Sequence, residues 1–194
     1  MLLTAPRAVG ARAKRNASPP APAGLGSFGG PVLRAIKAHL GSRQVSRVIY
    51  GAIIGLALIV ALEEHPPSSG VVVATLLGTA LAVGLAEFYS DIIGTETRTR
   101  RHVRRAELPD MMYDVAAVAY GIAFPAVFFV LAAADAIEED TAFTIAKWSG
   151  VGLIAVYGFI AAHLAGDSLS ASTLRALAAG LIGAFLIALK ALVH

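Results

Sequence analysis

Carboxylates that interrupt apolar segments are the residues of this chain best suited to chemistry. Glu87 and Asp91 lie four residues apart in one apolar stretch, and Asp110 and Asp114 have the same spacing at the start of the next. Residues at i and i+4 share a helix face, so each pair would place two carboxylates side by side. Such oxygens bind hard divalent cations, and stacked acids also relay protons. Glu87, Asp91 and Asp114 are therefore candidate ion-binding or proton-relay residues, and Glu87 and Asp114 are the candidate metal ligands.

His163 is a further candidate, because it forms an i,i+4 pair with Asp167 at the end of a later apolar stretch. An imidazole ligand would favour a softer cation such as ferrous iron. The alternative is that residues near the water interface have no function there, and that acids at a helix start only complement the helix dipole. Glu87 differs from the others in depth. At a rise of 1.5 Å per residue it lies about 24 Å from Val71, which leaves it roughly 6 Å inside a 30 Å hydrocarbon layer.

The elements that would position these groups are five long apolar segments. Hydrophobic residues make up 57% of the 194 residues, charged residues only 15%, and the mean hydropathy is +0.71. Soluble domains are closer to 25% charged, and about 20 apolar residues cross a bilayer as a helix. We therefore predict an all-α membrane protein with five transmembrane helices. The segments are residues 48–62, 71–93, 111–134, 142–165 and 174–193.

The distribution of charge between these segments predicts their orientation. Eight Lys and Arg residues and no acid precede Val48, and five arginines lie in the linker 94–109. The loop 135–140 carries acids only. Thirteen of the sixteen basic residues thus fall on one side, and the positive-inside rule makes that side cytoplasmic. The N-terminus is then cytoplasmic and the C-terminus extracytoplasmic, and the basic excess is explained without a nucleic-acid partner.

The N-terminal part of the chain predicts two further regions. Residues 1–30 are rich in Ala, Pro, Gly and Arg, which indicates a disordered basic arm or, alternatively, an organelle transit peptide. Residues 31–46 have apolar positions at helical spacing and predict an amphipathic lead-in helix on the bilayer surface. Residues 47–194 form the predicted five-helix transmembrane domain. The charge bias favours a bacterial inner membrane, with an organelle membrane as the alternative.

Three local features bear on packing and on enzyme function. Gly51 and Gly55 form a GxxxG pattern, which lets helix backbones approach closely. Pro125 should kink the third span. The chain has no Cys and no P-loop, HExxH or dinucleotide-binding fingerprint, so we expect neither an enzyme nor a bound cofactor; a divalent metal ion would be a substrate.

Short motifs in order along the chain resemble the vacuolar iron transporter family. Gly51-Ala-Ile-Ile-Gly-Leu56 is similar to a GANDGL-like motif in that family's first helix, and Ala86-Glu-Phe-Tyr-Ser90 to a GEYxS-like motif ending its second. A third similarity joins the last two helices, from His163 to Gly180. The resemblance covers residues 47–193. It implies transport of iron or manganese, Glu87 as an ion-coordinating residue, and a homodimer with the first helix near the subunit interface.

Two departures from that family lead to an alternative function. Ile53 and Ile54 stand where the family has Asn and Asp, and the linker 94–109 lacks the family's metal-binding cytoplasmic helices. A cation path would lose its charge at Ile54. The alternative is therefore a non-transporting membrane subunit or scaffold that uses the same fold to bind other proteins.

Overall fold

The computed structural model describes residues 42–193, and every regular element in this range is a helix. The all-α class predicted from the sequence is confirmed. In chain order the elements are α2 (Ser42–Leu62), α3 (Ser69–Thr99), the 3-10 helix η1 (Arg105–Glu107), α4 (Leu108–Ala123), α5 (Ala126–Ala133), α6 (Glu139–Leu164) and α7 (Leu169–Val193).

Four of the helices, α2, α3, α6 and α7, are each long and apolar enough to cross a membrane. The pair formed by α4 and α5 would make a fifth span if both halves cross together. These two helices are bent by 48° relative to each other. The predicted segment 111–134 thus consists of two helices, with the expected kink at Pro125 between them. Proline has no N–H for the helix ladder, and its ring clashes with the preceding turn.

Several helix boundaries differ from the predicted apolar segments. Helix α2 begins at Ser42 instead of Val48, so that residues 42–46, assigned to the lead-in helix, belong to α2. Helix α3 continues past Ile93 to Thr99, and α7 begins at Leu169. In each case the helix continues through polar residues beyond the apolar segment. The predicted basic arm, and the lead-in helix up to residue 41, lie outside the described residues.

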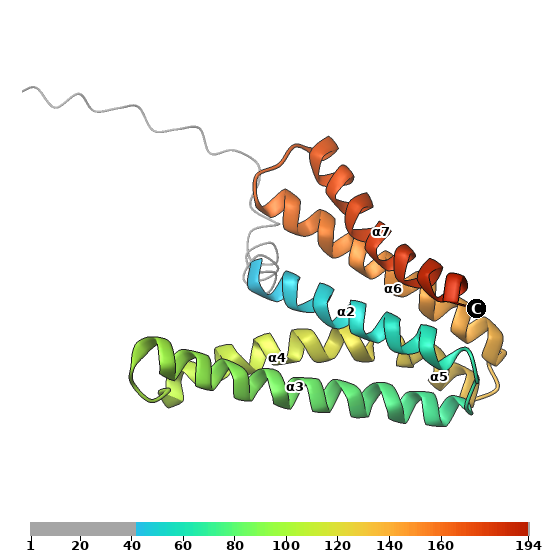
Figure 1. The fold of residues 1–194 in the computed structure, drawn as a ribbon, viewed down its shortest axis with the longest axis horizontal. Coiled ribbons are helices and arrows are strands. Elements are labelled where there is room, and N and C mark those ends of the chain that lie inside the picture. The colour runs from blue at the N-terminus through green and yellow to red at the C-terminus, as the bar shows by residue number, and fades with distance from the viewer. Residues whose placement is uncertain (1–41, 194) are drawn as a thin grey trace, which may run out of the picture.

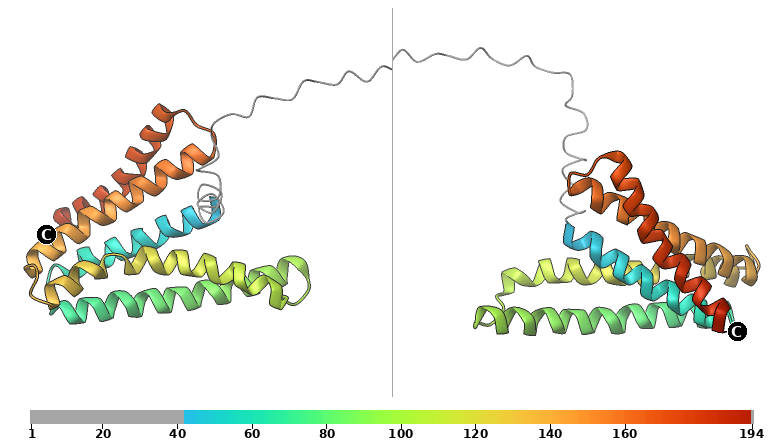
Figure 2. Two further views of the ribbon diagram at one scale, coloured as in Figure 1. Left: turned by 180° about the vertical axis from the view of Figure 1, so that it is seen from behind. Right: turned by 45° about the horizontal axis from the view of Figure 1, so that its top comes forward.

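Helix α2 lies between two helical hairpins (Figure 1). On one side it packs on α4, which pairs with α3, and on the other it packs on α6, which pairs with α7. The two further views show the same order of layers (Figure 2). The buried face of α2 repeats at helical spacing and consists of Val45, Val48, Ala52, Leu56 and Ile59. This central position makes α2 the helix that holds both hairpins together.

Glycines set the distance between α2 and α4. A Cβ atom added at Gly51 would lie 2.1 Å from the carbonyl oxygen of Val118, and one at Gly121 would lie 2.4 Å from that of Val48. A Cβ at Gly55 would lie 2.9 Å from the carbonyl oxygen of Ile122. Only glycine permits backbones to approach this closely. The GxxxG pattern thus has its partner helix within the same chain.

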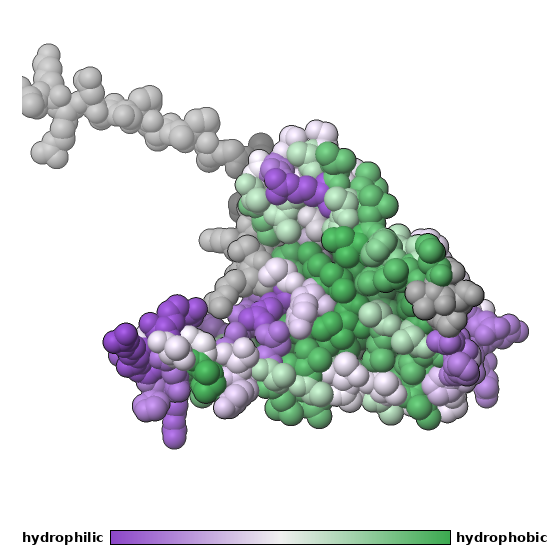
Figure 3. Space-filling view, in the orientation of Figure 1, coloured by the Kyte–Doolittle hydropathy of each residue, from purple (hydrophilic) through white to green (hydrophobic). Residues whose placement is uncertain are grey.

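Polar residues gather at two opposite ends of the bundle, with an apolar belt between them (Figure 3). We call the end with residues 63–68 and 135–138 the acidic end, and the end with residues 100–107 the linker end. At the acidic end the Lys147 ammonium pairs with Glu63, which joins α6 to α2. There, too, Glu139 accepts hydrogen bonds from the backbone N–H and hydroxyl of Ser69, at 2.9 and 2.7 Å. These two contacts hold α6 against the end of α2 and against the start of α3.

Helix α3 is much longer than a hydrocarbon layer is thick. Its 31 residues correspond to about 46 Å, against a layer of about 30 Å. If its apolar part crosses the membrane, its last turns project into water at the linker end. Gly94 to Thr99 form these turns, and Arg100, with a φ of 52°, ends the helix in the left-handed conformation. The base of this projection carries the candidate site.

Candidate functional site

Arg47 of α2 binds two of the predicted carboxylates of α3. One guanidinium nitrogen donates to Glu87, and the other lies 3.0 and 3.1 Å from the two carboxylate oxygens of Asp91. All three side chains are about one fifth exposed. The i,i+4 spacing aligns Glu87 and Asp91 on one face of α3, as the sequence predicts. The planar fork of arginine matches such a pair of acceptors.

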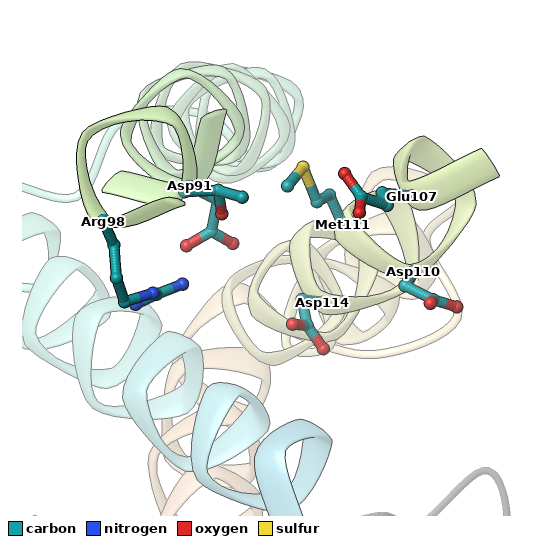
Figure 4. A pocket seen from close by; sticks show the side chains of 7 residues that line it. Asp91, Arg98, Glu107, Asp110, Met111 and Asp114 are labelled. Carbon is teal, nitrogen blue, oxygen red and sulfur yellow. The ribbon is translucent and has the colours of Figure 1, made fainter. Parts of the chain in front are cut away.

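A polar cavity of about 180 Å³ lies beside this ion pair, between α3 and α4 at the linker end. Asp91 and Arg98 extend into it from α3, while η1 and α4 supply the opposite wall (Figure 4). The residues that line it are Asp91, Thr95, Arg98, Glu107, Asp110, Met111 and Asp114. Asp91 therefore belongs both to the cavity wall and to the ion pair with Arg47.

Carboxylates outnumber guanidinium groups in the cavity wall. Four carboxylates and the Arg98 guanidinium line it, while Asp91 is paired with Arg47 and Glu107 with Arg101. Asp114 lies deepest in the fold, since only 8% of its surface is exposed. The volume is enough for several water molecules, so the cavity is a water-accessible polar site lined mainly by acids.

The α3–α4 linker is held in place by its own acids. Arg101 binds Glu107 through both guanidinium nitrogens, and Glu107 also accepts the backbone N–H of Arg104 at 3.0 Å. These bonds, that of Arg101 above all, lower the pKa of Glu107 to about 2. Glu96 binds the His102 ring at 3.0 Å and the Val103 N–H at 3.2 Å. A linker with five arginines therefore adopts one defined turn above the cavity.

Not every predicted site residue lies at this cavity. Glu87 binds Arg47 but does not line the cavity, whereas Asp91 and Asp114 do. His163 is exposed near the end of α6, where its ring stacks on Phe159 with a centroid distance of 6.0 Å. Its neighbour Asp167 pairs with Arg175 of α7 at 3.0 Å. The structure thus brings the acids of α3 and α4 together and leaves His163 on the other hairpin.

In the part of the chain that the structure describes, no group of three His, Asp or Glu side chains is arranged to hold a metal ion. The predicted metal ligands Glu87 and Asp114 lie on neighbouring helices, but Glu87 is bound to Arg47. Direct coordination by a fixed set of side chains is therefore not built into this conformation. Contact with a cation through its water shell remains compatible with the cavity.

The positions of Ile53 and Ile54 are apolar in their surroundings as well as in type. Ile54 packs against the buried cluster of Ala80, Val118 and Ile122, and Ile53 packs on the cluster around Leu56. Side chains of α3 and α4 fill the space around Ile54. At Ile53 and Ile54, helix α2 therefore makes ordinary hydrophobic contacts. These are the positions where the vacuolar iron transporter family has Asn and Asp.

Arg47 is the site residue that the sequence analysis did not single out. Its guanidinium crosses from α2 to the acids of α3. Its partners lie forty residues or more along the chain. The sequence did carry a signal for this pair. A charge inside an apolar helix is costly unless it is paired, and both Arg47 and Glu87 are such charges.

Comparison of the chain with protein-family models, with curated proteins and with solved structures returned no match.

Proposed function

We propose that this chain is an integral membrane protein that moves a divalent cation, iron or manganese, in exchange for protons. In this proposal it is a divergent relative of the vacuolar iron transporters and has no enzymatic activity. Helices α4 and α5 cross together as the third of five spans. The linker end faces the cytoplasm, the C-terminus lies outside, and the membrane is the inner membrane of a bacterium.

The observation that carries the proposal is the acidic cavity at the linker end. It opens between α3 and α4, is lined by four carboxylates and one guanidinium, and has a nearly buried aspartate, Asp114, in its wall. Two of the four acids are paired, Asp91 with Arg47 and Glu107 with Arg101. Acids at the edge of a hydrocarbon layer are costly and commonly mark ion or proton pathways. A hydrated cation would be attracted to the wall first. Glu87 and Asp114 would then take part in removing its water or in exchanging protons.

The deciding experiment is cation flux into proteoliposomes that contain the purified protein. Mn²⁺, Fe²⁺ and Zn²⁺ would be tested with and without a proton gradient. We expect Glu87→Gln and Asp114→Asn to abolish flux while both proteins remain folded, because each keeps its shape and loses its charge. Asp167→Asn is the matched control, since Asp167 pairs with Arg175 on the other hairpin. Equal flux by the wild type and both site variants would refute the proposal.

The proposed topology has a separate test. A reporter fused after His194 should be extracytoplasmic, and one inserted between Arg100 and Arg104 should be cytoplasmic. Both reporters on one side would mean that α4 and α5 do not cross the membrane as one span. The cavity would then face a different compartment from the one proposed.

A scaffold function is the second candidate, and the apolar packing of Ile54 favours it. The middle of α2 offers no charge to an ion, and Arg47 already neutralises Glu87 in part. A membrane subunit that binds other proteins would need neither. If no form of the protein transports any of the cations, and a defined protein co-purifies with it in mild detergent, the scaffold function is supported.

The homodimer stays a prediction, but the GxxxG pattern does not provide its interface. Gly51 and Gly55 face α4 of the same chain at backbone contact. A second copy must therefore bind another surface. Sedimentation of the protein in detergent would give the oligomeric state, and Gly51→Ala should alter the stability of each chain before it alters association.

A further inference from the structure

We infer that Arg47 is a built-in competitor for the transported cation, which must displace its guanidinium from Glu87 and Asp91 before it can enter. This inference rests on the proposed function, because it describes how the same acidic site is regulated. It assigns Arg47 a role that neither its position in the first helix nor the resemblance implies.

The geometry of the ion pair places the guanidinium where a cation would bind. The guanidinium divides its two terminal nitrogens between Glu87 and Asp91, and it touches both oxygens of Asp91, at 3.0 and 3.1 Å. It therefore occupies the positions where a cation would contact this face of α3. A cation bound there and a guanidinium bound there exclude each other.

The ion pair and the cavity share a residue. Asp91 belongs to both, so the guanidinium lies at the margin of the space in which a hydrated cation would be held. The pair is about one fifth exposed, which leaves the guanidinium within reach of water. Its release does not require the charge to pass through the apolar core.

Once displaced, Arg47 can carry its charge into water. It lies near the start of α2, and its side chain is long enough to move its charge toward the water at the linker end. An arriving divalent cation would replace one positive charge by two beside the same acids. When the cation leaves, the guanidinium can return, so that Glu87 is never left buried with no counter-charge.

The test measures Mn²⁺ binding to the purified full-length protein in detergent, by titration calorimetry, together with flux in proteoliposomes. Arg47→Gln should lower the Kd for Mn²⁺ by roughly 10- to 100-fold, since a charge-assisted contact to both acids is removed. Arg47→Lys keeps the positive charge but loses the planar, two-nitrogen geometry of the guanidinium. We expect its Kd for Mn²⁺ to stay within about threefold of the wild-type value. The double variant Arg47→Gln/Glu87→Gln should lose most of the gain.

Arg98→Gln is the charge-matched control, because it removes one positive charge from the cavity wall and leaves the Arg47 fork intact. We expect only a few-fold tighter binding from it. A gain as large as that of Arg47→Gln would overturn the inference, because net charge alone would then explain the effect. An unchanged Kd for Arg47→Gln, with Mn²⁺ bound by the wild type, would overturn this inference alone. Absence of Mn²⁺ binding by every form would overturn the proposed function as well.

If Arg47→Gln does not fold, the result is read from Asp91→Asn, which removes the shared carboxylate and leaves Glu87 paired. Competition predicts that this variant loses less Mn²⁺ affinity than Asp114→Asn, since part of the lost attraction was already offset by Arg47. A greater loss from Asp91→Asn than from Asp114→Asn would contradict competition.

Discussion

Replacing Gly51 by alanine should destabilise the protein far more than the same change at Gly78. At Gly51 the new Cβ would lie 2.1 Å from the Val118 carbonyl oxygen and 3.2 Å from the Cα of Gly121. At Gly78, on the outer face of α3, it would meet nothing within 4 Å. The two variants make an identical chemical change, so their difference isolates the packing of α2 on α4.

The size of the effect follows from how far the helices must separate. Carbon and oxygen atoms normally stay about 3.3 Å apart or more, so α2 and α4 must part by roughly 1 Å near Gly51. A gap of this size forfeits between a quarter and a half of the dispersion energy of the facing atoms. The obstructing atom belongs to the backbone and cannot rotate away, which places the cost near the upper end of overpacking, about 3 kcal/mol. Gly78→Ala should lie between no change and a gain of about 1 kcal/mol.

Thermal unfolding in detergent, followed by loss of the monodisperse size-exclusion peak, measures both variants. A cost of about 3 kcal/mol corresponds to a melting temperature about 6–12 °C lower for a chain of this length. Gly121→Ala should behave like Gly51→Ala, because its Cβ would meet the other side of the same contact. The double variant should lose less than the two single losses added together. Melting temperatures of Gly51→Ala and Gly78→Ala within about 2 °C of each other would refute the reasoning.

Three other outcomes can be measured with the same protein. Gly166, with a φ of +93°, joins α6 to α7, and Gly166→Ala should lower the melting temperature at a cost of about 1–2 kcal/mol, since other residues avoid this conformation; an unchanged value would contradict the strain. In an NMR titration Glu107 should protonate near its pKa of about 2 instead of the ordinary 4.5. Its hydrogen bonds therefore support the linker at neutral pH and are lost as the pH falls toward 2. Arg101→Gln should return the pKa of Glu107 toward 4.5. Ile54→Asp should cost about 3 kcal/mol and leave cation flux no higher, whereas Ile54→Val should cost about 1 kcal/mol; faster flux would show that charge at this position is enough to open a path.

Local pattern predicted much of this fold because each span is a continuous apolar run, and such runs are readable without tertiary information. Pro125 likewise predicts the kink at its own position, because proline cannot continue the helix hydrogen bonds. The ends of α3 and α7 were misplaced for a related reason. Thr, Glu and Arg are compatible with a helix outside the apolar layer, so the end of hydrophobicity is not the end of the helix.

The candidate site was predicted less completely, since its key contact is not local. The i,i+4 rule put Glu87 and Asp91 on one face of α3, where both bind Arg47. Of these two acids, Asp91 and not Glu87 shares the cavity with Asp114. The i,i+4 rule does not identify the positively charged side chain that lies opposite these acids. The partner, Arg47, comes from α2, and only the packing of α2 on α4 decides that its side chain reaches α3. The same packing explains why His163, on the far hairpin, lies away from the acids.

The placement of charge along the bundle limits how this fold could transport an ion. Charged contacts occur near the ends, with Arg47 and Glu87 toward the linker end and Lys147 and Glu63 at the acidic end, while the core around Ile54 is apolar. An ion does not cross packed hydrocarbon side chains, so transport requires helices to separate. The glycine contact holds α2 and α4 together at backbone contact, and the Lys147–Glu63 pair ties α6 to α2 at the acidic end. Toward the linker end, by contrast, the α6–α7 hairpin already diverges from α3 and α4 (Figure 1). Moving that hairpin would not clear the core around Ile54, which lies between α2, α3 and α4, so a transport cycle would have to part α3 from α2 and α4, a motion that a scaffold on the same fold would not need.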